Sequence, residues 1–128
     1  MKYYIALFAL LFPVLLAAQQ PPAKEKPKKL ADSYYAAQNY EEAVRYYLEY
    51  QRQNPKDFEA KYRIGICYYE IDSLDRGISY FKFALKNSNA PDDTYFYMAH
   101  SYQLKHRFEL AAKYYKLYLG TLSLKAPN

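Results

Sequence analysis

The residues able to perform chemistry are few and scattered along the chain. Cys67 is the only cysteine. His100 and His106 are six positions apart, without the cysteines or acidic residues that would complete a metal site. The three glycines are isolated and form no phosphate-binding loop. We therefore expect a protein that is not an enzyme and holds no metal or cofactor. Cys67 is expected to be a buried inert thiol, the alternatives being an intermolecular disulfide or a reactive thiol.

Other groups that could take part in catalysis have simpler explanations. The serines show no arrangement with histidine and aspartate that indicates a nucleophilic triad. The carboxylate pairs Glu41–Glu42 and Asp92–Asp93 lie at predicted helix starts, where acidic side chains favour the helix dipole. Nothing in these patterns indicates catalysis.

The elements that would position a site repeat every 34 residues. In the middle block, 58–91, Ile64 and Gly65 are followed by Tyr68, Gly77 and Phe81. Residues of the same class, aliphatic, small or aromatic, recur 34 positions earlier and later, without insertion or deletion. A sustained period of this length indicates stacked helix hairpins. The blocks cover about 24–57, 58–91 and 92–123.

Each block is expected to be a helix hairpin whose small residues let two helices approach closely, as Gly65 and Gly77 would. Apolar residues surround most of the first helix, which therefore packs on more than one side. Turn and cap signals separate the helices. They are Asn39 with Glu42, Asp57, the pair Asp72–Ser73, and Gly120 as a C-terminal stop.

This pattern resembles the tetratricopeptide repeat (TPR) family over about residues 24–123. The resemblance rests on aliphatic-small-x-x-Tyr in the first helix and small-x-x-x-aromatic in the second, with Pro55 ending the first block. Asn89 and Ser123 replace that proline in the later blocks. The resemblance implies an all-α fold, a right-handed α-solenoid of three hairpins.

The N-terminus carries a different pattern. Lys2, an apolar run and Leu16-Ala17-Ala18 are typical of a cleaved signal peptide over 1–18. Residues 19–29 form a linker rich in proline and lysine, and residues 124–128 a short tail. We therefore expect an exported protein, periplasmic or associated with the outer membrane, without stable membrane insertion after cleavage.

The positive charge is concentrated in the linker. From Leu30 onward there are 13 basic and 12 acidic residues, although the whole chain has a net charge of +5. A nearly neutral repeat region does not support a nucleic-acid partner.

By resemblance, TPR proteins commonly hold an extended or helical peptide on the concave face of their first helices. Tyrosine suits such a face, since it offers a large contact area with a polar tip. The alternative is that these rings only pack between neighbouring hairpins. The residues expected on this face are Tyr35, Glu59, Tyr62, Tyr69, Asp93, Phe96, His100 and Gln103.

The sequence thus predicts a protein-interaction scaffold of the bacterial cell envelope with a protein or peptide partner. It also resembles the N-terminal TPR part of envelope proteins that carry an OmpA-like peptidoglycan-binding domain, some of them linked to type IX secretion. Repeat arrays usually need a polar terminal surface, but the last hairpin would present Tyr114, Leu117, Tyr118 and Leu119 with no following helix. Either the chain is one part of a longer protein or another chain covers this end. The alternative function is a homo-oligomeric adaptor that self-associates through these four residues. A small-ligand binder or enzyme using the aromatic groove is the third hypothesis.

Overall fold

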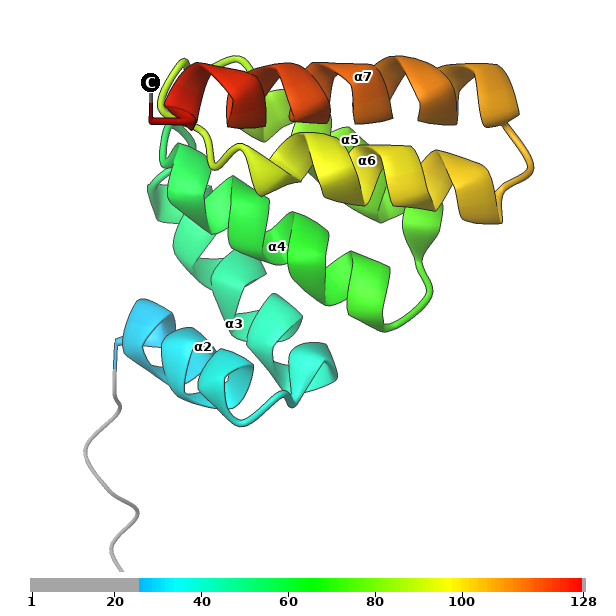
Figure 1. Ribbon diagram of the computed structural model, residues 1–128. Helices are drawn as coiled ribbons and strands as arrows, with labels where there is room; N and C mark the ends of the chain where they lie inside the picture. The colour runs from blue at the N-terminus through cyan, green and yellow to red at the C-terminus, as the bar shows by residue number, and fades with distance from the viewer. Residues whose placement is uncertain (1–25, 128) are drawn as a thin grey trace, which may run out of the picture.

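The computed structural model describes residues 26–127, which fold into six α-helices arranged as three successive hairpins (Figure 1). The first hairpin contains α2 and α3, the second α4 and α5, and the third α6 and α7. The helices are α2 (Pro27–Ala36), α3 (Tyr40–Gln53), α4 (Phe58–Glu70), α5 (Leu74–Ala84), α6 (Asp93–Leu104) and α7 (Phe108–Lys125). The predicted signal peptide, 1–18, and residues 19–25 of the predicted linker lie outside the described residues, whereas residues 27–29 of that linker belong to α2.

The same backbone turn joins the two helices of every hairpin. Gln38, Asp72 and His106 are 34 positions apart, and each has a φ of about 60°. The following amide in each case donates to the carbonyl of a repeated tyrosine, as Asn39 does to Tyr34 at 2.9 Å. This is a Schellman turn, which satisfies the last carbonyls of the first helix. The turn is built without glycine, so the sequence pattern gave no direct sign of it.

The predicted helix caps are confirmed at two positions. The side chain of Asn39 accepts from the amide of Glu42 at 3.4 Å, and that of Asp57 from the amide of Ala60 at 3.0 Å. Ser73 begins α5 without a side-chain cap hydrogen bond. That predicted cap is wrong, although the turn is at the predicted place.

Small residues lie where the helices of the middle hairpin cross. A Cβ atom on Gly65 would lie 2.6 Å from the ring of Phe81, and one on Gly77 would lie 3.2 Å from the carbonyl oxygen of Gly65. Contacts this close admit only glycine without a shift of neighbouring atoms. The predicted role of the two glycines in helix approach is therefore confirmed.

Tyrosine pairs stabilise each hairpin in the same way. Tyr34 stacks on Tyr46, and Tyr102 on Tyr114, with ring centroids 5.6 Å apart in both pairs. In the middle hairpin Tyr68 packs on Tyr80 at 5.7 Å. All three pairs are twelve residues apart, and they recur at the 34-residue period. The second tyrosine of each pair therefore belongs to the repeat, which the sequence pattern did not identify.

Two clusters of buried side chains join the hairpins into one stack. The first includes Tyr47 of α3 and Cys67 of α4, and the second includes Phe81 of α5 and Met98 of α6. All four side chains are fully buried. Burial raises the pKa of the Cys67 thiol to about 12, which agrees with the predicted inert thiol because the thiolate is the reactive form.

The last helix, α7, is longer than expected and forms one end of the stack (Figure 1). It passes through Gly120 and ends at Lys125, so the predicted stop at Gly120 is wrong. A glycine ends a helix when it takes a positive φ, and no glycine of the described chain has one. Within residues 26–127 no helix is both long and apolar enough to cross a membrane.

Candidate protein-binding face

The eight residues predicted to bind a partner all belong to the first helices of the hairpins. We call the surface that they form on α2, α4 and α6 the first-helix face. Tyr35 belongs to α2. Glu59, Tyr62 and Tyr69 belong to α4, and Asp93, Phe96, His100 and Gln103 belong to α6. Glu59, Phe96 and Gln103 are exposed, and the other five are half-buried.

Two hydrogen bonds connect α4 directly to α6 across this face. The hydroxyl of Tyr62 donates to Oδ2 of Asp93 at 2.9 Å, and the hydroxyl of Tyr69 lies 2.5 Å from Nδ1 of His100. In both pairs the partners are 31 positions apart. Successive first helices are therefore shifted by about one turn relative to the 34-residue repeat. The face is thus held together by some of the side chains that were predicted to bind a partner.

Tyr62 and Asp93 are directed inward. The ring of Tyr62 packs on the fully buried Phe81 with centroids 6.3 Å apart. Burial, and then the hydrogen bond to Asp93, raise the pKa of Tyr62. Among the described residues Oδ1 of Asp93 is buried without a hydrogen-bond partner. Tyr62 and Asp93 therefore act mainly in fixing α6 to α4.

Tyr69, His100 and Phe96 form an aromatic group that is open at one side. The ring of Phe96 stacks on that of His100 at 6.0 Å, and Tyr69 meets Tyr97 edge to face at 5.1 Å. Burial is the largest cause that raises the pKa of Tyr69. Phe96 is 36% exposed although it contacts four other rings. A large ring that is held in place and still reaches solvent is suited to contact a partner.

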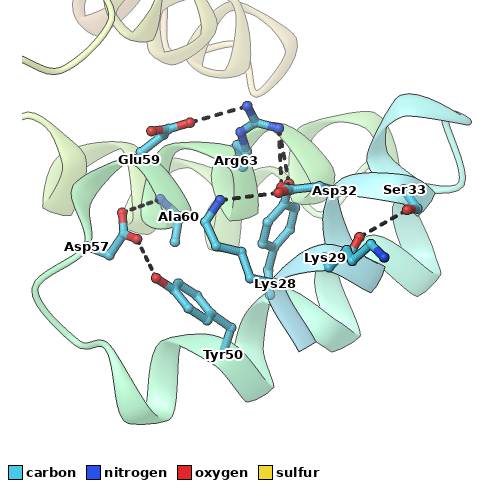
Figure 2. Close-up of polar contacts among 10 residues, drawn as sticks. Lys28, Lys29, Asp32, Ser33, Tyr50, Asp57, Glu59, Ala60 and Arg63 are labelled. Atoms are coloured by element: carbon cyan, nitrogen blue, oxygen red, sulfur yellow. Dashed lines mark hydrogen bonds and ion pairs between the residues drawn. The ribbon is translucent and has the colours of Figure 1, made fainter. Parts of the chain in front are cut away.

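A polar network connects α2 to α4 at the other end of the face (Figure 2). Asp32 accepts from the hydroxyl of Tyr47 at 2.6 Å and pairs with Lys28 at 3.2 Å. Arg63 lies 3.5 Å from Asp32, 31 positions earlier, and 3.2 Å from Glu59. Burial favours a higher pKa for Asp32, but the bonds from Tyr47 and Lys28 outweigh it and lower the pKa.

Arg63 is the residue of this face that the sequence analysis missed. Its guanidinium lies 5.1 Å from the ring centroid of Tyr35, besides pairing with Asp32 and Glu59. Arginine binds carboxylates and stacks on rings through one planar group. It therefore offsets part of the acidic charge of this face. Its position, 31 residues after Asp32, would have indicated their contact only if the shift between successive first helices had been known.

Gln103 completes the face at the far end of α6. Its Oε1 accepts from the hydroxyl of Tyr115 on α7 at 2.7 Å. Its side chain is exposed, and its amide nitrogen is available to a partner. No group of three or more histidine, cysteine or acidic side chains in the described chain could hold a metal ion.

The four residues predicted as an association face do not form one surface. Tyr114 stacks on Tyr102, and Tyr118 packs on Phe96 with centroids 5.7 Å apart. Both are half-buried, while Leu117 and Leu119 are exposed. Residues two apart on a helix point about 200° away from each other, so these two leucines lie on opposite flanks of α7. Further exposed apolar side chains of α7 are Phe108, Leu122 and Leu124.

Comparisons with known proteins agree with the repeat seen in the sequence. A family model described as tetratricopeptide repeat matches residues 28–94. The TPR repeat-containing protein MJ0263 of Methanocaldococcus jannaschii is 31% identical over 65 residues. These residues are 51% of this chain and 20% of that protein, so the chain spans only about a fifth of this relative.

Solved structures with the same arrangement of helices include those of MamA. MamA AMB-1 superposes with a TM-score of 0.70 at 26% identity, over 79% of this chain and 55% of that one. MamA MSR-1 gives a TM-score of 0.72 at 24% identity, over 78% and 57% respectively. These likenesses confirm the predicted all-α solenoid. With three hairpins in register and a family model that covers more than half of its length, the chain belongs to the tetratricopeptide repeat family.

Proposed function

We propose that this protein is an exported scaffold that binds a peptide segment of a partner protein on the first-helix face. The TPR fold is typical of non-enzymatic protein-interaction scaffolds. The observation that supports this particular face is the exposed ring of Phe96, stacked on His100 beside Tyr69. Rings already fixed by their neighbours lose little entropy when a partner packs on them.

The chemistry of the face suggests what the partner segment carries. Phe96 offers an apolar surface, and the exposed Gln103 offers an amide that can bond the backbone of a bound segment. Glu70, on the same helix as Tyr69, is exposed and forms no ion pair within the described part of the chain. A segment with a large apolar side chain and a neighbouring basic residue fits these groups.

The proposed location is the cell envelope, in the periplasm or at the outer membrane. The support is the sequence of residues 1–18, with Lys2 before an apolar run and small residues before Gln19. Within that location, a role in a secretion or peptidoglycan-linked complex follows from the resemblance described above. N-terminal sequencing of the protein recovered from a bacterial envelope fraction tests this, since cleavage after Ala18 is the expected result.

The binding proposal can be tested with peptides selected on the protein from a displayed random library. Phe96→Ala is expected to lower the affinity for a selected peptide by about tenfold, as truncation of an interface anchor commonly does. Phe108→Ala is the matched control, because Phe108 is a more exposed phenylalanine, at 62%, outside the face. An equal loss of affinity in both variants, or no loss of affinity in Phe96→Ala, would exclude the first-helix face as the binding site.

Self-association through α7 is the second candidate function. It is favoured by the exposed leucines of this helix, of which Leu119 and Leu122 lie on one flank and Leu117 and Leu124 on the other. Exposed apolar surface of this kind often marks an interaction site. Light scattering across a concentration series would show a dimer that Leu119→Asp dissociates. A monomer at every concentration would exclude this candidate.

A further inference from the structure

A cluster of lysines surrounds one exposed phenylalanine on the middle hairpin, and none of these residues belongs to the first-helix face. Phe83 is 46% exposed. The ammonium of Lys61 lies 5.1 Å from its ring centroid, and that of Lys86 lies 4.7 Å away. Lys56 and Lys82 line the adjoining surface. We call these four lysines and Phe83 the lysine patch.

The repeat does not explain this patch. Phe83 is not one of the repeated core positions, and its equivalents are Glu49 in the first hairpin and Leu117 in the third. Lys61 corresponds to Tyr95 in the third hairpin. A group that the flanking hairpins fold without is not required by the packing of a hairpin. Single members of the patch have basic or apolar equivalents, such as Lys116 and Leu117, but the complete combination occurs only in the middle hairpin.

Helix electrostatics explain only half of the patch. Lys82 and Lys86 lie at the C-terminal end of α5, where cations favour the helix dipole. Lys56 and Lys61 lie at the N-terminal end of α4, where the dipole disfavours them. The two helix ends meet because the hairpin is antiparallel (Figure 1). The result is a concentration of positive charge of which the helix dipoles stabilise only half.

Nearby carboxylates are already engaged elsewhere. Asp57 accepts from the hydroxyl of Tyr50 at 2.9 Å and from the amide of Ala60. Glu59 pairs with Arg63. None of the four lysines forms an ion pair with any described residue. Because Lys61 and Lys86 share one ring, their charges are at most about 10 Å apart, close to the screening length of about 8 Å at physiological salt.

The surface beside Phe83 is recessed. A hollow of about 310 Å³ is lined by Phe83, Ser79, Lys82 and Lys86. A second hollow, of about 210 Å³, is lined by Phe83, Phe58 and Pro55 together with Lys56, Lys61 and Lys86. Hollows lined by both phenylalanine and lysine side chains fit an apolar side chain that enters between anionic neighbours. A flat membrane surface would leave such recesses unfilled.

We propose that the lysine patch is a second binding site, for an acidic peptide segment that carries a large apolar side chain. The apolar side chain packs beside Phe83, and the flanking carboxylates pair with Lys61 and Lys86. This site is independent of the first-helix face, whose charged groups are largely paired with one another. Its binding is expected to weaken as salt rises, because the lysines lie at the surface.

The test uses fluorescence anisotropy with a labelled peptide in which one phenylalanine is flanked by glutamate and aspartate. Lys61→Gln with Lys86→Gln is expected to weaken binding about tenfold, and Phe83→Ala by a similar factor. The matched control is Arg76→Gln with Arg107→Gln, which removes the same charge near the turns that join α4 to α5 and α6 to α7, at the opposite end of the hairpins from Lys61 and Lys86. The control is expected to change affinity less than about twofold, as for distant surface charges.

Three results would overturn the proposal. The first is an equal loss of affinity in the arginine control, which would mean that only net charge attracts the peptide. The second is binding to vesicles of anionic lipid, lost in the lysine variant, with no binding of the peptide. The third is a loss of affinity in Phe96→Ala as large as that in the lysine variant, which would mean that the peptide binds the first-helix face. Far-UV circular dichroism of each variant establishes that it is folded.

Discussion

The hydroxyl of Tyr69 lies 2.5 Å from Nδ1 of His100, a residue 31 positions later on the next first helix. Tyr62 and Asp93 have the same spacing, and so do Asp32 and Arg63. A common spacing means that α2, α4 and α6 are offset from one another by the same amount. Side chains that could contact a partner therefore also set the geometry of the stack.

The Tyr62–Asp93 bond is expected to stabilise the protein measurably. Tyr62→Phe would leave the half-buried carboxylate of Asp93 without its hydroxyl donor, and the buried Oδ1 of Asp93 already lacks a partner in the described structure. Such a loss costs about 1–3 kcal/mol of unfolding free energy. Urea denaturation measures it. Tyr34→Phe is the matched control, since Tyr34 stacks on Tyr46 but its hydroxyl forms no bond with a described residue. Equal stability of the two variants would contradict this role.

Replacing two glycines by alanine should have opposite effects. In Gly65→Ala the new methyl group would lie 2.6 Å from the ring of the fully buried Phe81. Overpacking of this kind costs about 1–3 kcal/mol. Gly120 lies inside α7 with no atom within 4 Å of the same point. Gly120→Ala should therefore raise the unfolding free energy by about 0.5–1 kcal/mol. Destabilisation by both substitutions would contradict the continuous α7 helix.

The hairpin turns store strain that glycine should relieve. Gln38 has a φ of 58°, a conformation that costs a residue with a Cβ atom about 1 kcal/mol or more. Gln38→Gly should therefore raise the midpoint of thermal unfolding. The neighbouring Ala37 has a φ of −80°, so Ala37→Gly should lower it. Asp72→Gly is expected to raise the midpoint of thermal unfolding in the same way. A lower midpoint for Asp72→Gly would mean that the repeated turn is not strained.

Stability should decline at alkaline pH because of the buried tyrosines. Burial raises the pKa of Tyr35 from 10.0 to about 12, and the pKa values of Tyr47 and Tyr62 also rise. The unfolded chain thus loses these protons first. The stabilisation is complete below about pH 10 and is lost as the pH rises toward and through 12. Tyrosinate absorbance and far-UV circular dichroism should change together in this range.

The variant Tyr35→Phe provides the control for that titration. It removes one group whose pKa is raised, so alkaline unfolding should move to higher pH. The contrary result is that tyrosinate absorbance develops fully while the far-UV signal of the helices stays constant. In that case the tyrosines ionise in the folded protein, and burial does not raise their pKa values.

The 34-residue register predicted the hairpins, the glycine contact and two helix caps, because each depends on positions within one block. The contacts between residues 31 positions apart could not be predicted from this register. They depend on how far one first helix is shifted against the next, which side-chain packing decides. Arg63 was missed for this reason. Tyr114 was assigned to an outer surface because its equivalents, Tyr46 and Tyr80, had not been identified as repeated stacking positions.

The length of α7 illustrates a second limit. Gly120 is a common helix stop, but the surrounding chain decides whether it takes a positive φ. Here the hydroxyls of Thr121 and Ser123 bond to carbonyls three residues earlier, within the helix. The apolar residues after Gly120, Leu122 and Leu124, are exposed, so no periodic pattern indicated that the helix continues.

The most direct test of the central claim is a nuclear magnetic resonance titration of the isotope-labelled protein with a peptide selected from the library. The account predicts that the largest amide shifts occur in α4 and α6 around Tyr69, Phe96 and His100, and that Phe96→Ala abolishes them at the same peptide concentration. Shifts confined to α7, or to α3 and α5, would contradict the claim that the first helices carry the partner-binding face.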